Sequence, residues 1–282
     1  EAVEALEMFT DGRGGYYPQL WSSDQQPGKM VFDESCRHWC QSDYATTCLI
    51  RVLRQEAGLE TKTSIDYLAA GFENRSGLYF ANPYLVDWAL AYAISKDESA
   101  GQLRQKLLAE ILSSINEDYS FGVYDVAMST ALAILSMAAL GFRGRTMRVA
   151  QLRLLEFINS EGLLPTATPF YSSLRIDHEI PFKALLGLLA IDNLAPKTQD
   201  KYQKQIRQVQ EQCHGISLYF DTYKMIATSL AVLALSEKCL PEQYDLNLSK
   251  DKQENHPRYQ CRNHSEYIAK FALPPYLLMK TV

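Results

Sequence analysis

An alternation of two kinds of helical stretch limits what this chain can fold into. Five stretches are apolar on nearly every side: residues 44–53, 84–94, 126–140, 182–191 and 225–235. Four stretches between them carry one apolar stripe at the helical period: residues 63–72, 100–115, 146–159 and 198–212. A helix without a polar face must be covered all round, whereas a striped helix covers only one side. The alternation therefore predicts an all-α protein with an inner layer of apolar helices and an outer layer of amphipathic ones.

A turn that contains glycine, in most copies beside aromatic residues, precedes each apolar stretch. The last glycines of these turns are Gly15, Gly77, Gly122, Gly162 and Gly215, at intervals of 62, 45, 40 and 53 residues. Periods near 40–50 residues are typical of arrays of helical hairpins, which run open as a solenoid or close into a ring. The inner helices are too apolar to line an open concave surface, so we predict closure into an α/α barrel. No segment with the period and turn chemistry of a β-hairpin stands out.

The barrel is expected to occupy the whole chain, residues 1–282, as one domain. Residues 241–264 are polar and predict a loop, and residues 265–272 predict a short helix that Pro274 and Pro275 end. This C-terminal part, residues 241–282, is expected to cover one mouth of the barrel. The chain begins at Glu1 without methionine, which is compatible with a segment removed upstream.

Two of the glycine turns resemble a known repeat. Residues 116–127, Asn-Glu-Asp-Tyr-Ser-Phe-Gly-Val-Tyr-Asp-Val-Ala, resemble a degenerate copy of the Gln-x-x-Asp-Gly-Ser-Phe/Trp-Gly repeat of the terpenoid (squalene) cyclase and protein prenyltransferase superfamily, and residues 159–165 resemble another. The resemblance covers roughly residues 10–240. It implies an α/α toroid with a central cavity and often an isoprenoid substrate. The catalytic motifs of that superfamily, Asp-x-Asp-Asp, Asp-Asp-x-x-Asp and Asp-x-Cys, are absent from this sequence, so no reaction carries over with the resemblance.

Acidic residues recur where the inner helices are expected to begin. They are Asp43, Asp87, Asp125, Asp177 with His178 and Glu179, and Asp221. An aspartate at a helix start commonly caps the helix by accepting a bond from a backbone N–H. If the inner helices all begin at one mouth of a cavity, some of these carboxyls would instead be kept protonated and act as general acids. We therefore select Asp43, Asp125, His178 and Asp221 as candidate catalytic residues.

Aromatic side chains accompany these acidic residues. Rings that face a cavity would hold an apolar substrate and stabilise a carbocation by cation–π contact. The alternative is ordinary packing in the core and the turns. The candidate substrate-binding residues are Tyr44, Tyr84, Trp88, Tyr124, Tyr171 and Tyr223.

Cysteine and histidine cluster before the first and the last inner helix. Cys36, His38 and Cys40 precede the first, and Cys213 and His214 precede the last. Ring closure would make these helices neighbours, and the combined nitrogen and sulfur ligands would suit Zn²⁺. A nitrogen–oxygen set built on His178 and nearby carboxylates would instead suit iron or manganese. For each residue alone, the alternatives are a hydrogen-bonded histidine and an inert cysteine, so the cofactor stays open between none and a divalent metal.

Composition excludes several classes of function. The formal net charge is −5 and the isoelectric point is near 5.6, with lysine and arginine scattered, so a nucleic-acid groove is not expected. No apolar run reaches the ~18–20 residues of a membrane span. Six cysteines in a chain of this length are weak support for disulfides, and a reducing, cytoplasmic setting is expected.

Together these features predict an enzyme that acts on a hydrophobic small molecule, isoprenoid-like or another natural-product intermediate. Cyclisation or isomerisation by carboxylates at the inner-helix starts is the expected chemistry. Two alternatives remain at this point: a metal-dependent enzyme on the same fold, and a non-catalytic module that binds an apolar ligand or a partner protein. Substrate and oligomeric state are left open.

Overall fold

Seven α-helices make up about half of the part of the chain that the structure describes. In this computed structural model the described residues are 5–18, 21–22, 30–31, 42–75, 77, 79–122, 125–173, 203–204, 207 and 216–239. The elements are η1 (Leu6–Phe9), β1 (Trp21–Ser22), β2 (Met30–Val31), α2 (Tyr44–Glu56), α3 (Ile65–Gly71), η3 (Phe72–Asn74), α4 (Pro83–Ser95), η4 (Glu98–Ala100), α5 (Gly101–Ser113), α6 (Val126–Ala139), α7 (Arg145–Glu156), β3 (Phe170–Ser173), β4 (Ile216–Tyr219) and α11 (Met225–Ser236).

The predicted alternation of helices is confirmed in these residues. Helices α2, α4, α6 and α11 fall on four of the apolar stretches, and α3, α5 and α7 fall on three of the striped ones. The predicted helix at 182–191 lies outside the described residues. Of the predicted helix at 198–212, residues 203, 204 and 207 are described, and these are helical. The C-terminal segment 241–282 also lies outside them.

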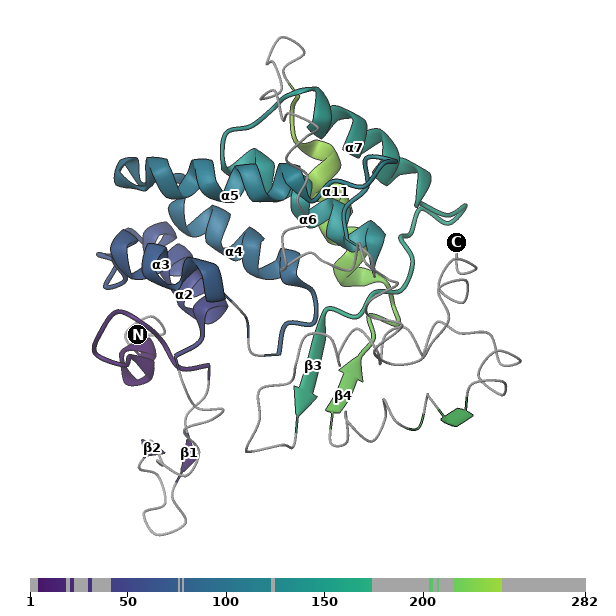
Figure 1. The fold of residues 1–282 in the computed structure, drawn as a ribbon. Helices are drawn as coiled ribbons and strands as arrows, with labels where there is room; N and C mark the ends of the chain where they lie inside the picture. The colour runs from purple at the N-terminus through teal and green to yellow at the C-terminus, as the bar shows by residue number, and fades with distance from the viewer. Residues whose placement is uncertain are drawn as a thin grey trace.

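The apolar helices form one layer and the amphipathic helices lie against it. Helix α2 packs on α4, α4 on α6, and α6 on α11, while α5 contacts α4 and α6, and α7 contacts α6 and α11 (Figure 1). Helix α6 shows why the layer forms, since every residue from Ala127 to Ala138 is buried. Its hydroxyls are satisfied within the layer: Thr130 donates to the Val126 carbonyl and Ser136 to that of Leu132. The helical class is thus confirmed in the described residues.

The inner helices begin at the same end of the array. The Asn82 amide, which caps α4, donates to Ser129 in the first turn of α6 at 2.8 Å. Gly77, shortly before α4, lies against Ala45 in the first turn of α2. Residues 167 and 168 in turn bond to Asp221 and Asp125, just before α11 and α6. The predicted convergence of the helix starts is therefore correct.

Three of the predicted glycine turns share one hydrogen-bond pattern. The N–H of the first residue donates to the carbonyl four residues later, in the pairs Asp11–Gly15, Asn116–Ser120 and Asn159–Leu163, at 3.0, 2.9 and 3.0 Å. The residue before that carbonyl has a positive φ in each case: Gly14, Tyr119 and Gly162. Glycine adopts this conformation without cost, and the tyrosine is the exception that makes the middle copy hard to recognise.

Each of these turns is fastened to an inner helix by a threonine. The N–H that follows the shared carbonyl donates to a threonine hydroxyl in the first turns of the helix, in the pairs Tyr16–Thr47, Phe121–Thr130 and Leu164–Thr228, at 2.9, 3.0 and 3.2 Å. A buried N–H needs such an acceptor. The sequence repeat is therefore a structural repeat of turn plus inner helix.

The third copy of this repeat is interrupted. The threonine bond joins turn 11–16 to α2 and turn 116–121 to α6, the next helix along the chain in each case but for short intervening elements. Turn 159–164 is instead joined to α11, which begins at Met225. Helix α11 packs directly against α6. The chain thus inserts about 60 residues between a turn and the helix that completes it.

The described residues also contain two short antiparallel strand pairs, and the longer pair is not a hairpin of neighbouring segments. Strands β3 and β4 pair antiparallel, with Phe170 opposite Tyr219 and Ser173 opposite Ile216, and the two-residue strands β1 and β2 also pair. Residues 215–220 had been assigned to a glycine turn. The pairing was missed because β3 and β4 have four residues each and lie 42 residues apart, so no local hairpin signal exists.

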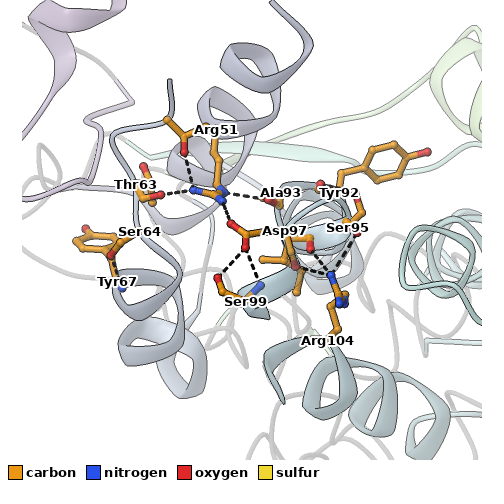
Figure 2. Close-up of polar contacts among 12 residues, drawn as sticks. Arg51, Thr63, Ser64, Tyr67, Tyr92, Ala93, Ser95, Asp97, Ser99 and Arg104 are labelled. Carbon is orange, nitrogen blue, oxygen red and sulfur yellow. Dashed lines mark hydrogen bonds and ion pairs between the residues drawn. The ribbon is translucent and has the colours of Figure 1, made fainter. Parts of the chain in front are cut away.

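The opposite end of the array is closed by arginine side chains. Figure 2 shows Arg51 of α2 donating from Nε to the Ala93 carbonyl at 2.9 Å and pairing with Asp97 at 2.6 Å. Arg104 of α5 donates to the Ile94 and Ser95 carbonyls at 3.3 and 3.4 Å, so the last carbonyls of α4 are satisfied. Hydrogen bonds from Ser99, with the Arg51 guanidinium, hold the pKa of Asp97 below its ordinary value.

We expect Thr130→Val to lower the free energy of unfolding by about 1–3 kcal/mol, because the buried N–H of Phe121 would lose its acceptor. Chemical denaturation followed by circular dichroism measures the change. Ser236→Ala is the control, since that exposed hydroxyl bonds only to the Leu233 carbonyl within its own helix. Equal stability of Thr130→Val and the wild type would show that the threonine bond does not hold the turn.

Candidate functional site

The end of the array where the inner helices begin is crossed by an extended segment, residues 163–170, which we call the strap. Three of its backbone bonds run to residues just before inner helices. The Ala167 carbonyl accepts from the Asp221 N–H at 2.8 Å, and the Pro169 carbonyl accepts from the Ala81 N–H at 3.0 Å. The Thr168 N–H donates to Asp125 Oδ2 at 2.7 Å. The strap therefore links the starts of α4, α6 and α11.

Asp125 does not cap the helix that it precedes. Its backbone is left-handed, with φ 49° and ψ 42°, and its side chain makes no bond to the first turn of α6. The carboxyl instead reaches across to the strap. Burial raises the pKa of Asp125 to about 6, and the bond from the Thr168 N–H opposes this rise only in part. The capping alternative thus does not hold for this residue, and a carboxyl with a raised pKa is a candidate acid or base.

Asp43 and Asp221 are helix caps. Asp43 Oδ2 accepts from the N–H and the hydroxyl of Thr46 at 2.8 and 2.7 Å. Asp221 accepts from the N–H groups of Met225 and Ala227 at 3.0 and 2.9 Å. Both are buried, and their oxygens are engaged by the first turn of α2 and α11. The geometry therefore shows that Asp43 and Asp221 cap their helices.

Asp87 does not lie at a helix start, contrary to the prediction. Helix α4 begins at Pro83 behind the Asn82 cap, and Asp87 lies inside it. Its carboxylate pairs with Arg75 at 2.8 Å, and both side chains are fully buried. The asparagine cap followed by proline was the signal that would have placed the start of α4 correctly.

The candidate aromatic residues that are described do not share one pocket wall. Tyr84 is buried, donates its hydroxyl to Ser114 and packs edge-on against Phe121, as expected for a core residue. The Tyr44 hydroxyl donates to the Leu68 carbonyl in the outer layer. Tyr223 is 83% exposed. Tyr124 and the side chain of Tyr171 lie outside the described residues.

Trp88 differs from the other aromatic candidates. The side chain is half-buried on α4 and packs edge-on against Tyr92, with the ring centres 5.5 Å apart. Its indole Nε1 is buried and has no hydrogen-bond partner among the described residues.

The predicted metal ligands cannot be placed. Cys36, His38, Cys40, Cys213 and His214 lie outside the described residues, and so does His178. Within the residues that are described, no three His, Cys, Asp or Glu side chains come close enough together to hold a metal ion. Cys48 is a buried core residue, as predicted, and burial raises the pKa of its thiol.

Sequence reasoning missed the polar side chains that assemble around the strap. Asn82, Ser129 and Thr168 are all buried, although each comes from a different segment of the chain. No motif marks them, since single polar residues in apolar stretches are common. These side chains come together only because the strap crosses the starts of the helices. That crossing depends on contacts between distant segments, which the local sequence does not encode.

Comparisons with protein families, with curated proteins and with solved structures found no match to this chain. In the part of the chain that is described, no helix is both long and apolar enough to cross a bilayer.

Proposed function

We propose that this protein is an enzyme that acts on a hydrophobic small molecule at the strap end of the helical array, with Asp125 as its acid–base group. The observation that carries the proposal is the state of this carboxyl. It accepts the Thr168 N–H of the strap at 2.7 Å, it does not cap its own helix, and burial raises its pKa to about 6. A carboxyl of this kind is protonated in part near neutral pH and can both give and take a proton.

The chemistry that fits such a group is proton-initiated isomerisation or cyclisation. Protonated Asp125 would transfer its proton to an alkene carbon or an epoxide oxygen of the substrate, which leaves a carbocation and the Asp125 carboxylate. Loss of a proton from a carbon next to the cation forms a new double bond. If the carboxylate accepts that proton, the enzyme returns to its starting state and no other reactant is consumed.

Apolar and aromatic residues beside the strap suit a substrate of this class. Phe80 and Phe170 pair as a backbone bridge, and their rings lie 5.8 Å apart next to the Asn82 cap of α4. Aromatic faces stabilise a cation that has been removed from water. The resemblance of residues 116–127 to the terpenoid cyclase repeat favours an isoprenoid, and closure of the array into a toroid is proposed on the same ground.

The proposal is tested with linear isoprenoids in deuterated buffer. Farnesol, squalene and squalene epoxide are incubated with the purified protein, and the products are analysed by gas chromatography with mass spectrometry. A product that carries solvent deuterium is expected, with turnover reduced by about a hundredfold or more in Asp125→Asn. Asp43→Asn is the matched control, because asparagine caps a helix about as well as aspartate. Unchanged turnover in Asp125→Asn would exclude Asp125 as the acid.

A second candidate, a non-catalytic module for an apolar ligand or partner, is favoured by one face of α11. Met225, Ile226, Val232 and Leu233 are exposed on this helix, which carries no charged side chain. Native mass spectrometry of gently purified protein distinguishes the two functions, since a bound lipid that is never converted would support the module. Elemental analysis of the same sample tests the predicted zinc or iron site.

A further inference from the structure

The strap is held to the helix starts by very few side chains. Its bonds to Ala81 and Asp221 use backbone groups on both sides, whereas Asp125 and Thr228 contribute side-chain acceptors. Thr228 cannot change its charge. Asp125 is thus the one ionisable group among the strap bonds of the described residues.

Of the charged groups on the neighbouring elements, Asp221, Asp87 and Asp118 are engaged by other partners. The strap and helix α6 contain no ionisable side chain. At the start of α11, Asp221 accepts two N–H groups of its own helix, and Lys224 follows it. Asp87 of α4 pairs with Arg75, and Asp118 of turn 116–121 pairs with Arg153, while Glu117 precedes it. Of the described surroundings, burial and the Thr168 N–H therefore govern the ionisation of Asp125.

We infer that the strap is a pH-sensitive latch, which is held most firmly when Asp125 is protonated and is loosened when Asp125 becomes charged. The neutral carboxyl keeps a carbonyl oxygen that accepts the Thr168 N–H. The charged carboxylate accepts it more strongly, but it must remain partly out of water to do so, and the cost of burying the charge outweighs that gain. Lifting the strap would return the charged group to water.

The direction of the pH effect follows from proton linkage. Burial raises the pKa of Asp125 from its ordinary 3.8 to about 6 in the closed state, and exposure in the open state returns it toward the ordinary value. The closed state therefore binds the proton more tightly. Its advantage is largest in acid and is lost as the pH rises through about 6. Because Asp125 is partly exposed, we expect opening to increase roughly tenfold between pH 4.5 and pH 7.5.

Amide hydrogen exchange on the full chain tests the latch, with rates corrected for the intrinsic effect of pH. The amides of Thr168, Ala81 and Asp221 report on the three backbone contacts of the strap. Their protection is expected to fall roughly tenfold from pH 4.5 to pH 7.5 in the wild type. In Asp125→Asn it should stay constant, since asparagine is always neutral and tolerates the left-handed backbone.

Asp43→Asn serves as the control and should keep the wild-type pH response, because Asp43 lies at the start of α2 and bonds to Thr46 rather than to the strap. Equal protection of the three amides at both pH values in the wild type would overturn the proposal. A fall in amide protection between the two pH values in Asp125→Asn that equals the wild-type fall would overturn the proposal too. If a variant fails to fold, the comparison of the wild type at the two pH values still tests the latch. None of these measurements requires turnover. A result against the latch therefore does not count against the proposed enzyme, and the reverse also holds.

Discussion

Arg75→Ala is expected to destabilise the folded chain by about 3–5 kcal/mol. Arg75 is fully buried and pairs with Asp87 of α4 at 2.8 Å and with Glu110 of α5 at 2.5 Å. Its guanidinium also donates to the Phe72 carbonyl and lies over the Phe72 ring. Removing the arginine leaves two carboxylates between the inner and the outer layer without their buried cation, and the cost of that unpaired charge exceeds the loss of the contacts themselves.

Thermal and urea unfolding of purified variants measure this effect. Lys106→Ala is the matched control, because Lys106 forms an exposed pair with Glu73 beside the same Phe72 ring and should contribute about 0–1 kcal/mol. The double variant Arg75→Met with Asp87→Leu should recover part of the loss, because one buried charge of each sign is removed. A loss in Arg75→Ala no larger than in Lys106→Ala would mean that the buried network does not join the two layers.

Leu132→Ala is expected to cost about 2–5 kcal/mol in unfolding free energy. Leu132 lies in the middle of α6, is fully buried, and belongs to the helix that contacts α4, α5, α7 and α11. The surrounding helices cannot all move inward, so a cavity remains. Leu152→Ala on α7 is the control, since half of that side chain is already exposed and its loss should cost less than about 1 kcal/mol. Equal effects of the two substitutions would contradict the placement of α6 at the centre.

Helix position was predictable because it depends on local pattern. Helix α6 was expected at 126–140 and spans Val126–Ala139, and α11 was expected at 225–235 and spans Met225–Ser236. Each stretch is apolar on every side and ends at polar or glycine residues, so period and length decide it without knowledge of the neighbours. The burial of α6 followed from the same pattern, since every residue from Ala127 to Ala138 is enclosed by its neighbours.

The candidate site was predictable only in part, because it depends on contacts between distant segments. Asp125 was selected from its place before α6, yet Asp43 and Asp221 occupy similar places and are caps. The difference is the Thr168 N–H, 43 residues further along, which draws the Asp125 carboxyl away from its own helix. Likewise, turn 159–164 is joined to α11 by the hydrogen bond from the Leu164 N–H to the Thr228 hydroxyl, two residues that lie 64 positions apart in the sequence. Neither contact leaves a mark in the local sequence.

The interrupted repeat has a consequence for how this chain tolerates change. The Ala167 carbonyl and the Asp221 N–H are joined by a 2.8 Å hydrogen bond, although the two residues are far apart in the sequence. Because the two residues lie side by side, a change in the length of the chain between them adds only a small, logarithmic entropy cost. Insertions between them are therefore expected to leave the bond between turn 159–164 and α11 in place.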